Sequence, residues 1–496
     1  MVSKFLKLLF NIVSKKQIAN IFAKLVQPAQ THRWMFFIIV KGVGLVYFIA
    51  FISLLSQLKG LYLSDGILPI ASYISRFESI SWFEWPHIFL STHDSYLWSV
   101  LWVGLVASIC LVFGILPLAM GVICWAVYGS FVNYGAVFMS FQWDSLLLEA
   151  GFLILVGVPV TLFWKKSDYY APPKLCIILG YVCCFKLMFA SGMVKLLSGD
   201  SLWWSAKALE YHYYTQPLPH MLSWFFHQLP AVFHKISCLI MFGIELIMPF
   251  LIFINHKARR IAGLSFIGLM SVVMVSGNYC FFNLLTMFLA LFCLDDEFFK
   301  LKNSSKQIKL SLFNLIRGGV AVVLIGVAVV NLSSQLIPGL AKIRRVTQPI
   351  SGWHLSHTYG LFASMTRQRD EVQILGSNDG ADWKAYSFKY KPNNDKEIPR
   401  WTWLHQPRLD WQLWFVALQG YSQRSWTNAL ITRLFDHSPS VLALFKEVPF
   451  ETAPKYLVMV KNSYHFSDWK EKQTTGTWWI VGETEQFSPV FKNNNF

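Results

Sequence analysis

The first long apolar run in this sequence is MFFIIVKGVGLVYFIAFISLLS, residues 35–56, in which Lys41 is the only charged residue. A helix of about 20 apolar residues is long enough to cross the ~30 Å hydrocarbon core of a bilayer. Similar runs follow along the chain, and we expect nine membrane spans, of which the seventh and eighth are short. The expected spans are residues 35–56, 97–116, 118–140, 145–164, 176–194, 236–254, 261–276, 280–294 and 316–334.

The composition agrees with a membrane location. Of the 496 residues, 54% are hydrophobic and only 14% are charged. Soluble globular chains carry about 25% charged residues. The composition therefore indicates a multi-pass membrane protein, and it excludes a disordered tail, a collagen and a small disulfide-stapled module.

The net charge of +16 comes from lysines and arginines that lie between the apolar runs and not in one patch. Basic loops are retained on the cytosolic side of a membrane, whereas a nucleic-acid-binding protein gathers its cations on one surface. We therefore interpret the charge as an orientation signal, and we expect the lipid bilayer and no nucleic acid as a partner.

The N-terminal segment 1–34 carries six basic residues and no acidic one. Its apolar residues Phe5, Leu8, Leu9 and Ile12 fall at helical spacing, which predicts a basic amphipathic helix on the membrane surface and no cleaved signal peptide. A cytosolic N-terminus is therefore expected.

The loop charges orient the rest of the chain. With the N-terminus in the cytosol, the basic loops at 165–166, 256–260 and 300–309 lie on the cytosolic side, and the more acidic loop 57–96 lies outside. An odd number of spans then places everything after residue 335 in the lumen or periplasm. Domain boundaries follow: the segment 1–34, a transmembrane bundle 35–335 with the outer loop 198–235, and an exported domain 340–496.

The exported domain has the pattern of a β-rich fold with a helical insertion. Alternating runs at 371–375 and 386–390 flank the turn signal Asn378-Asp379-Gly380, which predicts a hairpin. Helical stretches are expected near 409–420 and 426–446. All eight cysteines lie before residue 294, so this domain must be held together by its core, and disulfide exchange by this chain is not expected.

Ionisable residues inside the spans are functional candidates by default, because burying a charge in hydrocarbon is costly. Lys186 and Glu245 are the intramembrane charges nearest to mid-span. Two interpretations stay open: they pair as a tether between helices, or they serve transport or catalysis. A transporter would be expected to show an inverted repeat, and none is visible.

The expected topology brings three stretches, 143–149, 191–195 and 276–279, to the outer face together with the outer loop 198–235. One hypothesis is that they form a composite functional site. The alternative is that these loops only cap the bundle and dock the exported domain. No metal, nucleophile or cofactor motif is present, so neither a metal nor a cofactor is expected. The candidate residues of this cluster are Trp143, Asp144, Glu149, Lys195, Tyr211, His212, Tyr213, Gln216, Asn278 and Asn283.

Several of these stretches resemble the lipase maturation factor family. The resemblance rests on FQWDSLLLEAGF (141–152), SGMVKL (191–196), YHYYTQPLP (211–219) and GNYCFFN (277–283) in the membrane part. In the exported domain it rests on GSNDG (376–380), HQPRLDWQLWF (405–415) and GTWW (476–479). Within the tail motif, the candidates for client contact or domain docking are Gln406, Arg408, Asp410, Trp411 and Trp414.

The resemblance implies a membrane-anchored folding or assembly factor for exported client proteins, in this family lipases, and a chaperone-like protein more than an enzyme. Animal members of the family are found in the endoplasmic reticulum. The two glycosylation sequons, at Asn303 and Asn331, fall in an expected inner loop and inside a span, which favours a bacterial inner membrane.

A second resemblance supports an alternative of another class. Residues 192–196, GMVKL, are similar to the segment that carries the catalytic lysine of vitamin K-dependent γ-carboxylase-like membrane enzymes. On that interpretation Lys195 acts as a base, because partial desolvation disfavours the ammonium form of a lysine.

Overall fold

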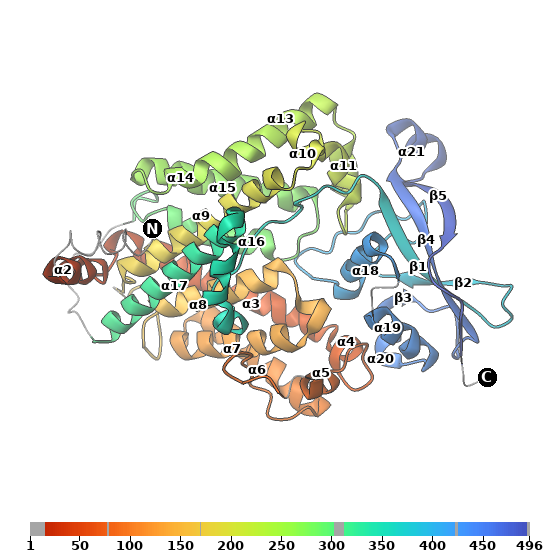
Figure 1. Cartoon of the computed structure of the whole chain (residues 1–496), viewed down its shortest axis with the longest axis horizontal. Helices are drawn as coiled ribbons and strands as arrows, with labels where there is room; N and C mark the ends of the chain where they lie inside the picture. The colour runs from red at the N-terminus through yellow and green to blue at the C-terminus, as the bar shows by residue number, and fades with distance from the viewer. Residues whose placement is uncertain (1–14, 77–78, 169, 302–311, 422–424, 494–496) are drawn as a thin grey trace.

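A computed structural model of the chain describes residues 15–76, 79–168, 170–301, 312–421 and 425–493. In Figure 1 a bundle of helices occupies one end of the molecule and a twisted sheet the other. The expected amphipathic positions Phe5, Leu8, Leu9 and Ile12, and nearly all of loop 300–309, lie outside the described residues. The described part of the N-terminal segment begins with helix α2 (Lys15–Leu25).

Six helical stretches of the described chain are long and apolar enough to cross a membrane. The three other expected spans overlap the helices α7 (Pro117–Tyr134), α8 (Gln142–Gly157) and α16 (Phe282–Ala290). Helix length and apolar composition therefore support six spans, and nine remains a prediction. The six are Gln30–Leu55, which contains α3 (Arg33–Leu55); α6 (Asp94–Phe113); α9 (Lys174–Leu197); Ala231–Leu251, which joins α13 (Ala231–Phe242), the π-helical turn η3 (Gly243–Ile247) and α14 (Met248–Leu251); α15 (His256–Ser276); and α17 (Leu312–Leu336).

Helices α3 and α9 form the centre of the bundle. Helix α3 packs against α6, α8 and α16, and α9 packs against α8, α16 and α17. Small residues permit the closest approaches: a Cβ at Gly151 would lie 2.0 Å from the hydroxyl of Tyr47. Helices α13 and α15 lie at the periphery in Figure 1, and their exposed side chains include Ile236, Ile240, Ile261 and Leu264, which is the pattern of helices that face lipid.

Two connecting loops carry short helices of their own. The loop after α3 contains α4 (Leu58–Tyr62) and α5 (Ile70–Arg76). The loop after α9 contains α10 (Ser201–Trp204), α11 (Ala208–Thr215) and α12 (Met221–His227). Both loops contact the C-terminal region: Arg433 donates to the carbonyl of Ser64, and the indole of Trp224 donates to the carbonyl of Ser467.

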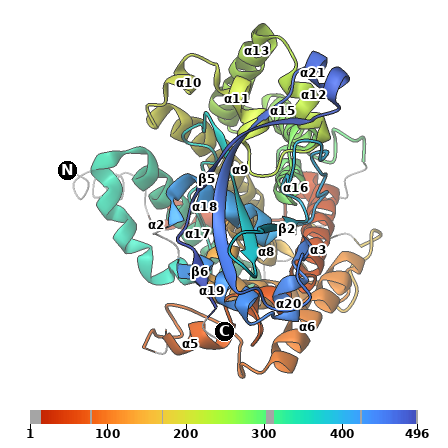
Figure 2. The same ribbon diagram turned by 90° about the vertical axis from the view of Figure 1, so that its right-hand side faces the viewer.

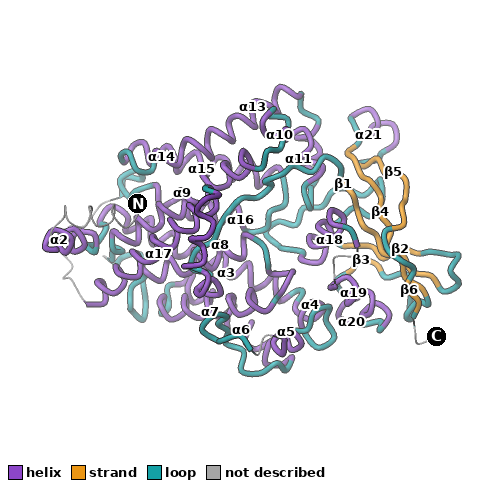
Figure 3. Tube along the Cα trace, in the orientation of Figure 1, coloured by secondary structure: helices purple, strands orange, loops and turns teal. Residues whose placement is uncertain are grey.

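The C-terminal region is built on an antiparallel sheet, which faces the viewer in Figure 2 and is coloured orange in Figure 3. The strand order is β3-β2-β1-β4-β5, and β6 pairs with β4. The strands are β1 (Arg369–Ser377), β2 (Lys384–Phe388), β3 (Phe445–Glu447), β4 (Tyr456–Phe466), β5 (Trp479–Gln486) and β6 (Phe491–Lys492).

The expected hairpin is confirmed between β1 and β2. Gly380 has a φ of +80°, which a side chain would oppose, and the backbone N–H groups of Ala381 and Asp382 donate to the carboxylate of Asp379 at 2.8 and 2.9 Å. On β1 the alternation expected from sequence buries Val372 and Ile374.

The helical insertion agrees with the sequence in part. Helix α18 (Arg408–Gln419) matches the stretch expected near 409–420. The single helix expected over 426–446 is wrong, because α19 (Ser425–Phe435) ends before His437, whose φ is +49°, and a new short helix, α20 (Pro439–Leu442), begins at a proline. The last residues of that stretch belong to β3, because a short apolar run fits a strand as well as a helix.

Candidate functional site

One buried ion pair connects the C-terminal region to the bundle. Arg408, the first residue of α18, donates from Nη1 and Nη2 to the two carboxylate oxygens of Asp144 in the first turn of α8, at 3.0 and 2.9 Å. Both side chains are 0% exposed. The hydroxyl of Tyr128 donates to the same carboxylate at 2.5 Å, and Arg408 also donates to the carbonyl of Phe138 at 2.5 Å. The carboxylate thus has three donors, as a buried charge requires.

The residues around Arg408 in the tail motif also bind the bundle. Gln57, just after α3, donates from its amide to the carbonyl of Gln406 and accepts from the backbone N–H of Arg408, both at 2.8 Å. The indole of Trp411 packs edge-on against that of Trp143, with ring centroids 4.8 Å apart. All three motif residues are buried in this structure.

Two further motif residues attach α18 to its surroundings. The carboxylate of Asp410 accepts from the backbone N–H groups of Tyr390 and Lys391 at 2.8 and 3.2 Å. The indole of Trp414 donates to the carbonyl of Thr215 at 2.9 Å, which joins α18 to the end of α11. The motif therefore joins α18 to the bundle and to loop 198–235.

A second buried pair involves Lys186, but its partner is Glu149 and not Glu245. The Lys186 ammonium lies 2.5 Å from the Glu149 carboxylate, and it also donates to the hydroxyl of Ser356 at 2.6 Å. The other oxygen of Glu149 accepts from the hydroxyl of Tyr359 at 2.6 Å and from a backbone N–H. This pair therefore holds the segment that leads from α17 into the sheet.

Glu245 pairs with Lys195 instead, at 2.8 and 3.0 Å from its two carboxylate oxygens. Glu245 lies on the π-helical turn η3, and a Cβ at Gly192 would lie 3.0 Å from the Cβ of Glu245, so the glycine permits the close approach of the two helices. The interpretation that Lys186 and Glu245 pair with each other is therefore wrong, because each has a nearer partner of opposite charge.

A cavity of about 170 Å³ lies beside the Lys195–Glu245 pair, between α9, α13, α15 and α16. His212, Tyr213 and Asn283 also line it, among mostly apolar side chains. Asn283 is 1% exposed, and neither atom of its side-chain amide has a hydrogen-bond partner among the described residues. The cavity therefore contains polar atoms whose hydrogen bonds the described chain does not supply.

The hydrogen bonds beside this cavity define which ring nitrogen of His212 carries the proton. The amide nitrogen of Gln216 donates to the carbonyls of Tyr213 and Ser276, so its oxygen accepts from the hydroxyl of Tyr279, at 2.9 Å. Nε2 of His212, 2.8 Å from the same hydroxyl, must then be the donor. Nδ1 of His212 is left as an acceptor with no partner among the described residues.

The two remaining residues of the predicted cluster lie on either side of this network. The side chain of Asn278 donates to the carbonyls of Leu218 and Arg400 at 3.0 and 2.9 Å and accepts from the backbone N–H of Thr402 at 3.0 Å. Tyr211 is half-buried on α11. The predicted residues thus lie partly at the junction with the C-terminal region and partly along the cavity. Trp411 lies between the two groups, because its ring contacts Trp143 on one side and Tyr279 on the other, at centroid distances of 4.8 and 6.3 Å. A single composite site stays a prediction.

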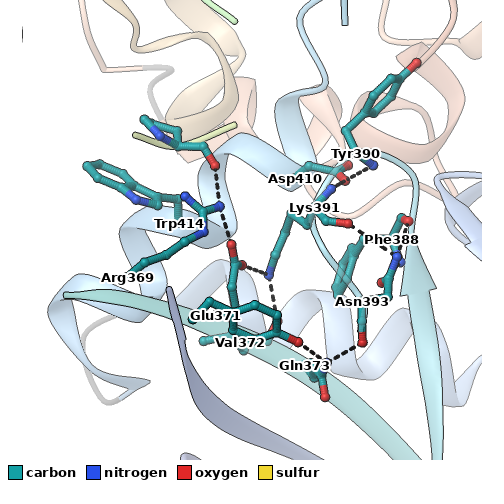
Figure 4. Close-up of polar contacts among 12 residues, drawn as sticks. Arg369, Glu371, Val372, Gln373, Phe388, Tyr390, Lys391, Asn393, Asp410 and Trp414 are labelled. Atoms are coloured by element: carbon teal, nitrogen blue, oxygen red, sulfur yellow. Dashed lines mark hydrogen bonds and ion pairs between the residues drawn. The ribbon is translucent and has the colours of Figure 1, made fainter. Parts of the chain in front are cut away.

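Sequence reasoning missed a third charged network, shown in Figure 4. Arg369 donates to the carbonyls of Tyr214 and Pro217 at 3.0 and 2.9 Å and forms an ion pair with Glu371. Lys391 lies 2.9 Å from the other oxygen of Glu371. The signal was present: opposite charges two residues apart in a strand lie on the same face.

One histidine of the junction is held neutral. Burial, together with the nearby cations Arg408 and Lys389, lowers the pKa of His405 to about 4. The backbone N–H of Gln406 donates to the hydroxyl of Ser53, and that hydroxyl lies 3.0 Å from Nδ1 of His405. A neutral ring with Nδ1 as the acceptor satisfies this arrangement, since the hydroxyl then donates its own proton.

Comparisons with known proteins identify relatives over most of the chain. The family model for the lipase maturation factor transmembrane domain matches residues 32–301, and that for the lipase maturation factor C-terminal domain matches residues 355–489. Lipase maturation factor 1 of Homo sapiens is 30% identical over 525 residues, covering 95% of this chain and 92% of that protein. Lipase maturation factor 2 of Homo sapiens is 30% identical over 582 residues, covering 91% and 81%. No solved structure matches the chain.

Replacing Arg408 tests the docking junction. Arg408→Met leaves Asp144 buried without its cation, so we expect a loss of about 3–5 kcal/mol in the free energy of unfolding. Thermal unfolding of the detergent-solubilised chain measures the effect. Lys384→Met is the matched control, because the Lys384–Asp382 pair is exposed and contributes at most about 1 kcal/mol. Equal stability of the two variants would contradict the assigned importance of the pair.

Replacing Asn283 tests the cost of its unpaired amide. Asn283→Leu removes a buried amide that has no hydrogen-bond partner among the described residues, so we expect the free energy of unfolding to rise by about 1–3 kcal/mol. Asn278→Leu is the control, and it should lower the stability, because three buried partners lose their hydrogen bonds. A fall in the melting temperature of Asn283→Leu would show that the cavity holds a partner for this amide.

Proposed function

The chain belongs to the lipase maturation factor family, and we propose that it is a membrane-anchored factor that helps exported client proteins, by family resemblance lipases, to fold or assemble. The observation that carries the proposal is that the two family matches cover both the helical bundle and the sheet domain. The candidate spans and the docked sheet domain fit a protein that holds a client-binding domain at a membrane surface.

We propose nine spans, with α7, α8 and α16 crossing the membrane in addition to the six longer stretches. Contacts among the loops support this arrangement. Arg33 donates to the carbonyl of Asp168, Trp34 donates its backbone N–H to Asp296, and Arg260 pairs with Asp295 at 2.6 Å. The start of α3 and the loops near residues 168, 260 and 295 thus gather at one end of the bundle, as the cytosolic side of the proposed topology requires.

In this topology the sheet domain lies in the periplasm or in the lumen of the endoplasmic reticulum, where an exported client folds. We propose that the buried residues of the tail motif hold the domain in place and that the client binds elsewhere on its surface. Under this proposal Arg408 and Trp411 act on the client only through the position of the domain.

An exposed aromatic patch is the proposed client surface. Met221 and Phe225 on α12 and Trp469 on α21 (Trp469–Thr475) are exposed, and the rings of Phe225 and Trp469 lie 5.6 Å apart. Trp403 is 72% exposed and stacks on Trp401, which stacks on His220 next to the patch. Exposed apolar patches mark interaction sites, and tryptophan is enriched among the residues that dominate protein interfaces.

A catalytic role for Lys195 is the second candidate function. The cavity beside Lys195 favours it, since a substrate could enter there. Lys195, however, donates to Glu245 and to the carbonyl of Ser191, and these contacts must be broken before it can accept a proton.

Variants of the aromatic patch test the maturation proposal. The double variant Phe225→Ala/Trp469→Ala should lower the yield of active co-expressed lipase at least about tenfold, since interface aromatics contribute about 2 kcal/mol or more each. The measurements are secreted lipase activity and the amount of the chain in the membrane. Trp102→Ala, at an equally exposed tryptophan of α6, is the control and should have no effect.

The opposite pattern would support the enzyme. If the patch variant matures the lipase normally and Lys195→Met abolishes the function without loss of folded protein, the client surface is wrongly placed and the lysine is the active group.

Reporter fusions test the topology. Alkaline phosphatase fused after residue 340 should be active, because it folds only outside the cytosol, and a fusion after residue 166 should be inactive. An inactive fusion after 340 in the presence of stable protein would overturn the proposed orientation.

A further inference from the structure

The segment that follows α17 has an apolar stripe with a period of three. It forms the 3₁₀ helix η5 (Pro338–Val346), in which side chains three residues apart lie one above another. Leu340, Ile343 and Val346 therefore share one face. Ile343 is 37% and Val346 74% exposed, so the protein leaves part of this face uncovered.

The stripe follows a candidate membrane span with exposed apolar residues. Helix α17 leaves Val322, Val323 and Val329 exposed, and η5 begins two residues after it ends. An apolar face that extends from a membrane span into a helix with basic residues beside it is the pattern of a segment that lies in the headgroup region.

Three cations flank the stripe. Lys342, Arg344 and Arg345 are exposed, and none of them forms an ion pair with any acidic residue that the structure describes. All three line a cavity of about 560 Å³ between η5, the last turns of α17 and the segment 347–358. Basic residues without acidic partners retain their full attraction for an anion.

The same cavity offers neutral hydrogen-bond donors and contains no acidic residue among the described residues that line it. Its lining includes the hydroxyl-bearing residues Ser351, Ser356 and Thr358. The base of the cavity is held by Asn331, which accepts from the hydroxyl of Thr347 at 3.0 Å and donates to the carbonyl of Ser356 at 3.0 Å. Cations together with hydroxyl donors are the groups that bind a phosphate.

We propose that this cavity binds the phosphate of an anionic lipid headgroup while the apolar stripe of η5 enters the same leaflet. The cations supply the positive charge, and the hydroxyls donate hydrogen bonds to the phosphate oxygens. The stripe places the cavity at the depth of the headgroups. A free phosphate would satisfy the cations alone, whereas a lipid satisfies the cations and covers the stripe. The lipid is therefore the occupant that explains both features.

The site would also couple lipid binding to the docked domain. Ser356, on the cavity wall, accepts from Lys186, and the backbone N–H of His357 donates to Glu149 at 2.9 Å. A bound headgroup would thus order the segment that these two charges hold. This role goes beyond client maturation and can be tested without a client.

Native mass spectrometry of the full chain in detergent measures the binding. We expect retention of phosphatidylglycerol over phosphatidylcholine with the same acyl chains, and a loss of about 30-fold in Arg344→Gln/Arg345→Gln, since each basic residue at an anionic surface contributes about fivefold. Lys396→Gln/Lys470→Gln, which removes two exposed cations of the sheet domain, is the matched control and should bind as the unchanged chain does.

Two further measurements distinguish a bound lipid from a bound free anion. Ile343→Ser/Val346→Ser should weaken phosphatidylglycerol retention and leave the melting temperature in inorganic phosphate unchanged. Any one of three outcomes would overturn the proposal. These are equal retention of the two lipids, normal binding by Arg344→Gln/Arg345→Gln, and displacement of the lipid by inorganic phosphate at the lipid's own concentration.

Discussion

The ion pair between Arg408 and Asp144 is the contact on which the arrangement of the two parts depends. Moving either charge out of water costs several kcal/mol, and the cost is offset only when both ions are present with their hydrogen bonds complete. One ion comes from the sheet domain and the other from the bundle, and both are 0% exposed. Neither part can therefore bury its own charge without the other, which makes the docked arrangement specific.

The same rule governs the charges inside the bundle. Glu149 and Glu245 each have a lysine at hydrogen-bond distance, and the two pairs serve different ends. Lys186 and Glu149 hold the segment that leads to the sheet domain, whereas Lys195 and Glu245 border a cavity that contains polar atoms without hydrogen-bond partners among the described residues. These four residues thus form one structural pair and one pair beside a cavity.

Local patterns in the sequence predicted local structure well. The hairpin at Asn378-Asp379-Gly380 and the helix at α18 follow from turn chemistry and apolar spacing, which act over a few residues. The prediction of one helix over 426–446 is wrong, because it gave more weight to the apolar run than to Pro439, where a new short helix begins. The partner of Lys186 could not be predicted, because residues 149 and 186 come together only when α8 packs on α9.

The sequence by itself determined that this is a membrane protein with a C-terminal sheet domain, because hydropathy and alternation are properties of consecutive residues. It also determined the family, because the matching motifs are linear. Only the tertiary structure decided that Gln406, Arg408 and Trp411 are buried, and that Arg369, Glu371 and Lys391 form a network with loop 198–235. Burial and ion pairing depend on which distant segments meet, and in a low-dielectric interior that meeting decides whether a charge is tolerated at all.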